Sequence, residues 1–150
     1  MIFIYICEND FELRSKIEEE INDYIGKKKY QMKVQQSTSE PMQLLEKMQD
    51  FVKRGLYFID TDFSEIDGIL LGKEIRKRDA RGFIVFITSD KMLILKAFKY
   101  HIEVVDYIMK GEASEIDIFE SIKRCLDTVA QRTEDELMSK WSKVYHSGNE

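Results

Sequence analysis

Residues 56–62 have the sequence LYFIDTD, in which four apolar or aromatic residues are followed at once by two acids that flank a threonine. A short run of this kind is typical of a strand that is buried on both faces of a parallel sheet. Two other stretches share the pattern, MIFIYICEND at 1–10 and FIVFITSD at 83–90. Each is apolar until it meets polar or acidic residues, so the chemically reactive side chains are expected at the strand ends.

Between these runs, apolar residues recur at steps of three and four, which is the spacing of one helix face. Leu13, Ile17, Ile21 and Ile25 form one such stripe, and Gly26 is predicted to end that helix with a left-handed cap. We predict helices at 10–26, 42–52, 69–78, 93–100 and from about 114 to 129, and strands at 1–7, 30–36 (an edge strand), 56–59, 83–87 and 104–109. This alternation predicts a three-layer α/β sandwich of five βα units around a parallel sheet.

Length and composition indicate one globular domain. The chain has 150 residues, of which 43% are hydrophobic and 34% charged, and its net charge is −5. This charge argues against binding of nucleic acid through the overall field of the chain. No apolar run approaches the roughly 18 residues of a membrane span, and Met1 leads into a strand without a basic leader. We therefore expect neither a membrane segment nor a signal peptide.

Cysteine and histidine are scarce. Cys7 and Cys125 are too few for a disulfide framework, which predicts a reducing, cytoplasmic location. Together with His101 and His146 they are also too few for an ordinary zinc site. Both cysteines are predicted to be small buried apolar residues, and His101 a surface residue.

The carboxyl ends of parallel strands meet at one edge of the sheet, where α/β proteins bind their ligands. The side chains expected there are Glu8, Asn9, Asp10, Asp60, Asp62, Thr88, Ser89 and Lys110. The first turn has no glycine, so neither a Rossmann nor a P-loop phosphate cradle is expected. What converges instead is a cluster of acids with one lysine and hydroxyl groups.

This cluster predicts a magnesium site that performs phosphoryl chemistry. Mg²⁺ prefers oxygen ligands and is typically held by one or two carboxylates, several waters and substrate phosphate. A carboxylate beside the ion can attack phosphorus in line and form an acyl phosphate, and Lys110 and Thr88 would stabilise the developing charge. The competing interpretation is that each residue is an ordinary polar group at an exposed strand end. Suitable residue types at the successive strand ends favour a functional site.

Four stretches in this order resemble the receiver domain of two-component response regulators: ICEND at 6–10, LYFID at 56–60, FITS at 86–89 and DYIMK at 106–110. A fifth, IDGILLGKEIRKRD at 66–79, is similar to the LytTR-type receivers of the accessory gene regulator A and competence regulator E group. The resemblance covers about residues 1–130. It implies a flavodoxin-like (βα)5 fold with strand order 2-1-3-4-5 and a part in peptide quorum-sensing regulation of transcription.

The resemblance also implies a role for each strand-end residue. Asp60 would accept a phosphoryl group from a sensor histidine kinase, with Mg²⁺ bound by Glu8, by Asp60 and by the backbone carbonyl of Asp62. Thr88 would hydrogen-bond the phosphoryl group, and Lys110 would pair with its charge. The domain would thus be a phosphoacceptor that catalyses at most its own phosphoryl transfer and dephosphorylation, and not an enzyme in the ordinary sense.

The family pattern bears on two further positions. The chain matches the pattern at one of them and departs from it at the other. Tyr107 matches the aromatic residue whose rotation reports phosphorylation on the face formed by helix 4, strand 5 and helix 5. Receivers usually have two adjacent acids after the first strand, whereas here the second is Asn9, a weaker ligand for Mg²⁺. Asp10 is expected to cap the first helix, with a metal role as the alternative.

The helical rhythm continues past Val129 into a tail at 131–150, where Leu137, Trp141 and Val144 extend the apolar stripe. The tail is interpreted as a linker helix, a dimer contact or a partly ordered end. The resemblance implies a homodimer on activation and DNA binding only through a downstream effector domain, so the chain is expected to be a receiver fragment or a stand-alone receiver. Two other functions stay open: a docking module that acts independently of phosphate, and a flavin carrier.

Overall fold

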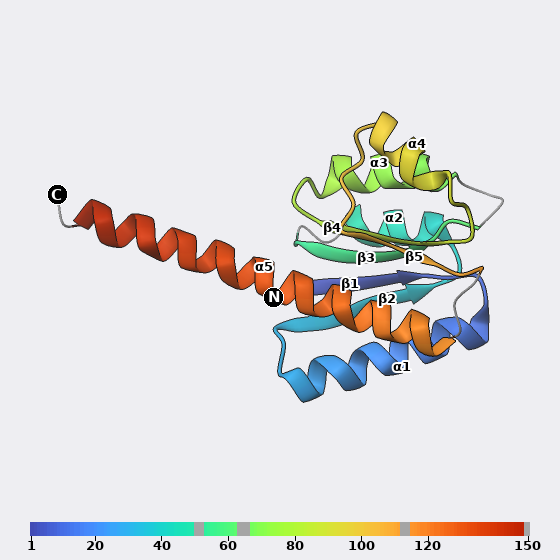
Figure 1. Ribbon diagram of the computed structural model, residues 1–150, viewed down its shortest axis with the longest axis horizontal. Helices are drawn as coiled ribbons and strands as arrows, with labels where there is room; N and C mark the ends of the chain where they lie inside the picture. The colour runs from blue at the N-terminus through green and yellow to red at the C-terminus, as the bar shows by residue number, and fades with distance from the viewer. Residues whose placement is uncertain (50–52, 63–66, 112–114, 149–150) are drawn as a thin grey trace.

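The computed structural model describes residues 1–49, 53–62, 67–111 and 115–148. Strands and helices alternate along these ranges (Figure 1). The strands are β1 (Ile2–Cys7), β2 (Met32–Thr38), β3 (Gly55–Asp60), β4 (Phe83–Thr88) and β5 (Asp106–Met109), and the helices are α1 (Phe11–Lys28), α2 (Pro41–Gln49), α3 (Gly68–Arg78), α4 (Leu93–Lys99) and α5 (Glu115–Gly148). Residues 50–52 of the predicted second helix, residue 66 of the quoted motif, the predicted helix start at 114, and the tail residues 149–150 lie outside the described ranges.

The five strands form one sheet in the order β2-β1-β3-β4-β5, and every neighbouring pair is parallel. This confirms the predicted flavodoxin-like arrangement, including β2 at the edge. The order of the strands reverses between β1 and β3, so their carboxyl ends flank the position at which such sheets bind ligands.

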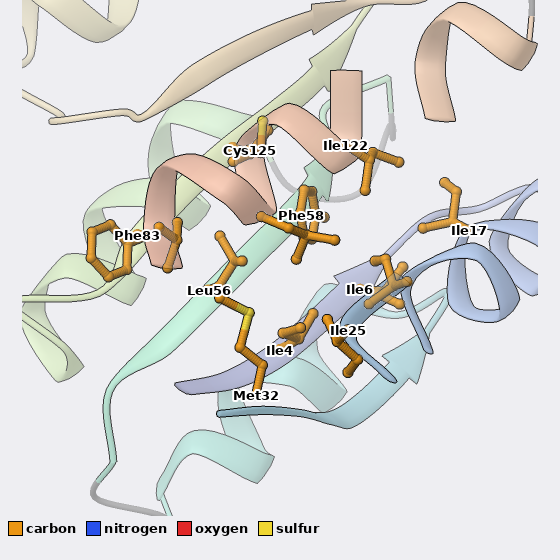
Figure 2. Packing of buried hydrophobic residues seen from close by; sticks show 14 of the residues in the cluster. Ile4, Ile6, Ile17, Ile25, Met32, Leu56, Phe58, Phe83, Ile122 and Cys125 are labelled. Atoms are coloured by element: carbon orange, nitrogen blue, oxygen red, sulfur yellow. The ribbon is translucent and has the colours of Figure 1, made fainter. Parts of the chain in front are cut away.

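Helices cover both faces of the sheet, with α1 and α5 on one side and α2, α3 and α4 on the other (Figure 1). Each residue of β1, β3 and β4 is buried, as the apolar runs predicted. On the first side, the core cluster includes Ile17 of α1, Phe58 of β3, and Ile122 and Cys125 of α5 (Figure 2). The core of the second side is formed by Tyr5, Leu44, Tyr57, Leu71, Ile75, Phe86 and Ala97, among others.

Both cysteines are buried, as predicted. Burial raises the pKa of the Cys7 thiol and of the Cys125 thiol to about 12, so both stay protonated at neutral pH. His101 is exposed, also as predicted.

The end of α1 differs from the prediction. Gly26 lies inside the helix, which continues to Lys28 and ends where Lys29 adopts a φ of 56°. The Lys29 and Tyr30 N–H groups donate to the Gly26 and Ile25 carbonyls, so the capping bonds of the helix end form without a glycine at the left-handed position. Because α1 is longer than predicted, β2 covers Met32–Thr38 and not 30–36.

The predicted helical continuation past Val129 to Val144 is confirmed, and the helix also includes residues 146–148, which were expected to fray. Among its residues whose burial is described, Val129 is the last fully buried one, and the helix then projects past the end of the sheet near the N-terminus (Figure 1). We call residues 131–148 the α5 tail. Its Glu136 carboxylate accepts two hydrogen bonds from the Arg54 guanidinium, at 2.5 and 3.1 Å, which ties the tail to the segment before β3.

Within the described ranges, no helix combines the length and the hydropathy that a membrane crossing requires.

Candidate functional site

The carboxyl ends of the central strands bring four of the predicted site residues together. Glu8 follows β1 directly, Asp60 and Thr88 are the last residues of β3 and β4, and Lys110 follows β5. Glu8, Asp60 and Thr88 are almost fully buried, with 1%, 3% and 0% of their surface exposed. The Lys110 N–H donates to the Thr88 carbonyl at 2.9 Å, which fixes the start of the lysine side chain beside β4.

Lys110 joins the two buried carboxylates. Its Nζ atom lies 2.9 Å from Asp60 Oδ2 and 3.1 Å from Glu8 Oε1. Burial alone would lower the pKa of the lysine, but its hydrogen bonds and attraction to the two acids raise it instead. One fixed ammonium group thus faces two carboxylates, and the site has an excess of negative charge when both acids are ionised.

Ionisation is least favourable at Glu8. Burial raises the pKa of its carboxyl to about 7, and a hydrogen bond and repulsion from Asp60 add to the rise while Lys110 opposes it. Its Oε2 atom is buried without a hydrogen-bond partner among the described residues. An ionised oxygen in such a position is costly unless a cation or a proton binds it.

Asp60 is held by its own loop as well as by the lysine. The Asp62 N–H donates to Asp60 Oδ1 at 2.9 Å, so each oxygen of the acceptor carboxylate has a partner. The Asp62 side chain points elsewhere and accepts from the N–H and hydroxyl of Ser89, at 3.2 and 3.0 Å. The prediction assigned only the backbone carbonyl of Asp62, so this bridge between the loops after β3 and β4 is a new feature of the site.

The Thr88 hydroxyl is positioned by the loop that follows it. Its oxygen accepts a hydrogen bond from the Asp90 N–H at 2.9 Å. A hydroxyl that accepts in this way keeps its own proton for donation to another acceptor.

The turn after β1 separates the roles of three consecutive residues. Asp10 caps α1, because its Oδ1 atom accepts from the N–H groups of Glu12 and Leu13 at 2.9 and 3.2 Å. This confirms the predicted cap. Asn9, which lies between Glu8 and Asp10 in the sequence, is exposed.

Two residues that support the site were missed from the sequence. Arg14 of α1 donates to the Glu8 carbonyl at 2.8 Å, and the Glu8 N–H donates to the Thr38 carbonyl at 3.0 Å. Arg14 belongs to none of the sequence motifs, because it lies on a helix beside the loop. Thr38 was missed because the second strand was predicted to end at Gln36.

Tyr107 of β5 is half-buried, and its ring centroid lies 6.0 Å from that of Phe86 on β4. Burial raises the pKa of its hydroxyl, so the side chain is a neutral aromatic group at neutral pH. Only two residues separate it from Lys110 in the sequence, and its side chain packs against the core cluster that includes Leu93 and Ala97 of α4.

The donor set fits Mg²⁺ and not a softer metal. Among the described residues, no group of three or more His, Cys, Asp or Glu side chains is arranged to hold a metal ion. Mg²⁺ needs fewer, because waters and phosphate oxygens complete its octahedron. Glu8 offers an oxygen without a hydrogen-bond partner beside the Asp60 carboxylate, and Asp62 follows with its backbone carbonyl. These residues therefore suit a hard divalent cation.

Comparison with known families decides what kind of domain carries this site. Residues 4–124 match the family described as Response regulator receiver domain. The chain belongs to this family. The predicted resemblance is therefore confirmed, and the chain is a receiver domain of a two-component system.

Individual relatives agree with this assignment. Accessory gene regulator protein A of Staphylococcus aureus is 35% identical over 142 residues, which cover 94% of this chain and 58% of that protein. The protein of the same name from Staphylococcus epidermidis is 34% identical over the same length. Among solved structures, the response regulatory domain of protein mrkE from Klebsiella pneumoniae has a TM-score of 0.67 and 26% identity, and the match covers 87% of this chain and 99% of that one. The receiver chain thus spans 58% of the length of the two curated relatives.

Proposed function

We propose that this receiver domain is the phosphoacceptor of a transcriptional regulator of the peptide quorum-sensing type, in which Asp60 takes a phosphoryl group from a sensor histidine kinase. The observation that supports this most directly is the position of Asp60. Its carboxylate is buried at the end of a central strand, between the Lys110 ammonium and the Asp62 N–H. The resemblance of residues 56–60 to the acceptor motif of receivers supports the same assignment.

The reaction is an in-line displacement at phosphorus. A carboxylate oxygen of Asp60 attacks, an O–P bond forms, and the N–P bond of the phosphohistidine breaks with its electron pair passing to the imidazole. Mg²⁺, bound by Glu8, Asp60 and the Asp62 carbonyl with Asn9 as a weak additional ligand, would neutralise charge on the phosphoryl oxygens. The Asp62 N–H, which donates to Asp60 Oδ1, orients the attacking carboxylate.

Lys110 and Thr88 stabilise the product. The Lys110 ammonium already lies beside Asp60, so it can pair with a phosphoryl oxygen after only a small side-chain movement. The Thr88 hydroxyl has a proton to donate to the same group. Movement of this hydroxyl toward the phosphoryl group would open space that Tyr107 fills, which couples the new charge to packing near α4.

The α4–β5–α5 face is suited to transmit this change to a partner. Phe98 on α4 is 82% exposed, and Leu95 on the same helix is 61% exposed. Exposed apolar side chains gathered on one element are typical of a protein-binding surface. We therefore place kinase or activation-dependent homodimer contacts on this face. The receiver proper would comprise 1–130, and DNA binding would belong to an effector domain outside this chain, toward which the tail at 131–150 leads.

A docking module that works independently of phosphate is a weaker interpretation. Asn9 is its only support, and Asn9 is exposed whereas the acceptor, the lysine and one acidic metal ligand are all present and in contact. A module without phosphoryl chemistry has no need for two buried carboxylates and a lysine at the strand ends.

The proposal is tested by intact mass measurement after incubation with Mg²⁺ and acetyl phosphate. The parent chain and Asp62→Asn are expected to gain about 80 Da, the mass of one phosphoryl group, and Asp60→Asn is expected to gain nothing. Asp62→Asn is the matched control because it removes a neighbouring carboxylate and keeps the backbone carbonyl. A gain by Asp60→Asn, or no gain by the parent with acetyl phosphate and with a phosphorylated histidine kinase, would contradict the proposal.

A further inference from the structure

The α5 tail exposes an apolar stripe that the receiver site does not explain. Leu137, Trp141 and Val144 follow one another at steps of four and three, so they lie on one face of the helix. They are 56%, 64% and 64% exposed. Trp141 is also the only tryptophan of the chain, and exposed tryptophan on a helix face is typical of the centre of a protein interface.

A groove at the base of the tail continues this stripe. It has a volume of about 550 Å³ and lies between α5 and the starts of β1 and β2. Its apolar lining includes Met1, Ile2, Met32, Ala130 and Leu137. Because Leu137 belongs to both features, the stripe and the groove form one surface that runs from the tail onto the body of the domain.

The charges of the tail are separated along its length. Its first half holds three acids, Glu134, Asp135 and Glu136, against one base, Arg132, and its second half holds Lys140 and Lys143. Glu136 is already paired with Arg54, but the first half stays acidic overall, so two tails that lie parallel and in register would bring one acidic half beside the other. Two tails that lie antiparallel would bring the acidic half of each beside the basic half of the other, which is favourable.

We propose that the α5 tail pairs with the α5 tail of a second copy of this chain in antiparallel orientation. With the two-fold axis near Ser139, Trp141 of each copy lies over Leu137 of the other, and the end of each helix reaches the other copy's groove. The contact is isologous and closes as a dimer, because the stripe and the groove serve both copies alike. It does not depend on Asp60 or on phosphorylation, so it stands or falls separately from the proposed function.

The first test is the oligomeric state of the unphosphorylated chain by sedimentation velocity over a range of concentrations. We expect a dimer of twice 17.8 kDa and a blue shift of the Trp141 emission as the dimer forms. Trp141→Asp is expected to weaken the dimer about thirtyfold, the effect of losing an interface hot spot. Met42→Asp is the matched control, because it places the same charge on an exposed apolar residue of α2. A monomer, or a dimer that Trp141→Asp leaves intact, would overturn the proposal.

The second test determines the orientation of the two tails. Spin labels are attached at Gln131→Cys in one variant and at Lys140→Cys in another, since both native cysteines are buried. Antiparallel tails place the two 140 positions near each other, and they offset the two 131 positions by about 24 Å along the helix axes. A parallel pair would give similar short distances at both positions, and that result would overturn the proposal. Circular dichroism of each variant verifies that the helix is intact.

Discussion

The ammonium group of Lys110 lies 2.9 Å from the carboxylate of Asp60, although 50 positions separate the two residues in the chain. Only the parallel arrangement of β3, β4 and β5 brings them together. In the unphosphorylated domain, the lysine neutralises the charge of the acceptor carboxylate. After phosphorylation, its ammonium group would pair with an oxygen of the phosphoryl group on Asp60. The lysine therefore serves the stability of the resting domain as well as its proposed chemistry.

We expect Lys110→Met to lower the free energy of unfolding by about 3 kcal/mol at pH 8, because it leaves two buried carboxylates without their cation. The loss is expected to be smaller at pH 5, where Glu8 is protonated. Urea unfolding at the two pH values measures it. The control is Lys96→Met, since Lys96 lies 3.6 Å from Asp90 in an exposed pair and should change stability by less than about 0.5 kcal/mol. Equal losses in the two variants would contradict this account of the site.

The raised pKa of Glu8 predicts that the free energy of unfolding falls as the pH rises. Its pKa is about 7 in the folded chain against 4.5 when unperturbed, so between these values the folded state retains a proton that the unfolded state has lost. Stability that is fully present below pH 4.5 is therefore lost as the pH rises through about 7, with a slope of at most about 1.4 kcal/mol per pH unit. Urea unfolding in EDTA should show this slope in the parent and a flatter profile in Glu8→Gln. An unchanged slope in the variant would assign the effect to another group.

Asn9→Asp is expected to tighten Mg²⁺ binding by about thirtyfold, because a carboxylate about 4 Å from a divalent ion adds about 2 kcal/mol of attraction in water. Isothermal titration calorimetry of the unphosphorylated chain gives the affinity. The same change on an exposed residue of α1, Asn22→Asp, adds the same charge away from the site and should leave the affinity within twofold. If both variants bind Mg²⁺ alike, Asn9 does not take part in the metal site.

The Arg54–Glu136 pair predicts a measurable link between the tail and the sheet. Arg54 lowers the pKa of Glu136, so the pair stabilises the folded chain above about pH 4.5 and loses this effect as the pH falls. Because Glu136 is 42% exposed, we expect Glu136→Gln to cost about 0.5–1 kcal/mol. Hydrogen exchange of the amides at 131–137 should accelerate, whereas that of the buried turn around Leu126 should not. Exchange that is faster along the whole helix would indicate general destabilisation instead.

The sequence was sufficient for the order of elements and for the four residues that meet at the strand ends, Glu8, Asp60, Thr88 and Lys110. Both follow from local patterns: buried runs such as 83–87 and the polar residues that end them. It was insufficient where tertiary contacts decide. Lys29 ends α1 in a conformation that glycine usually adopts, which no residue type at that position indicates. The Asp62–Ser89 bridge joins two loops whose distance in space depends on the whole sheet.

The α5 helix also has a mechanical consequence. Its first half is packed on the sheet up to Val129, and the 19 residues from there to Gly148 extend about 28 Å with no other helix from the described part of the same chain beside them. A tilt of the packed half by about 10° would therefore displace the far end by about 5 Å. A rearrangement near β5 too small to alter the fold would thus be amplified with distance, and the tail would act as a lever arm for the receiver.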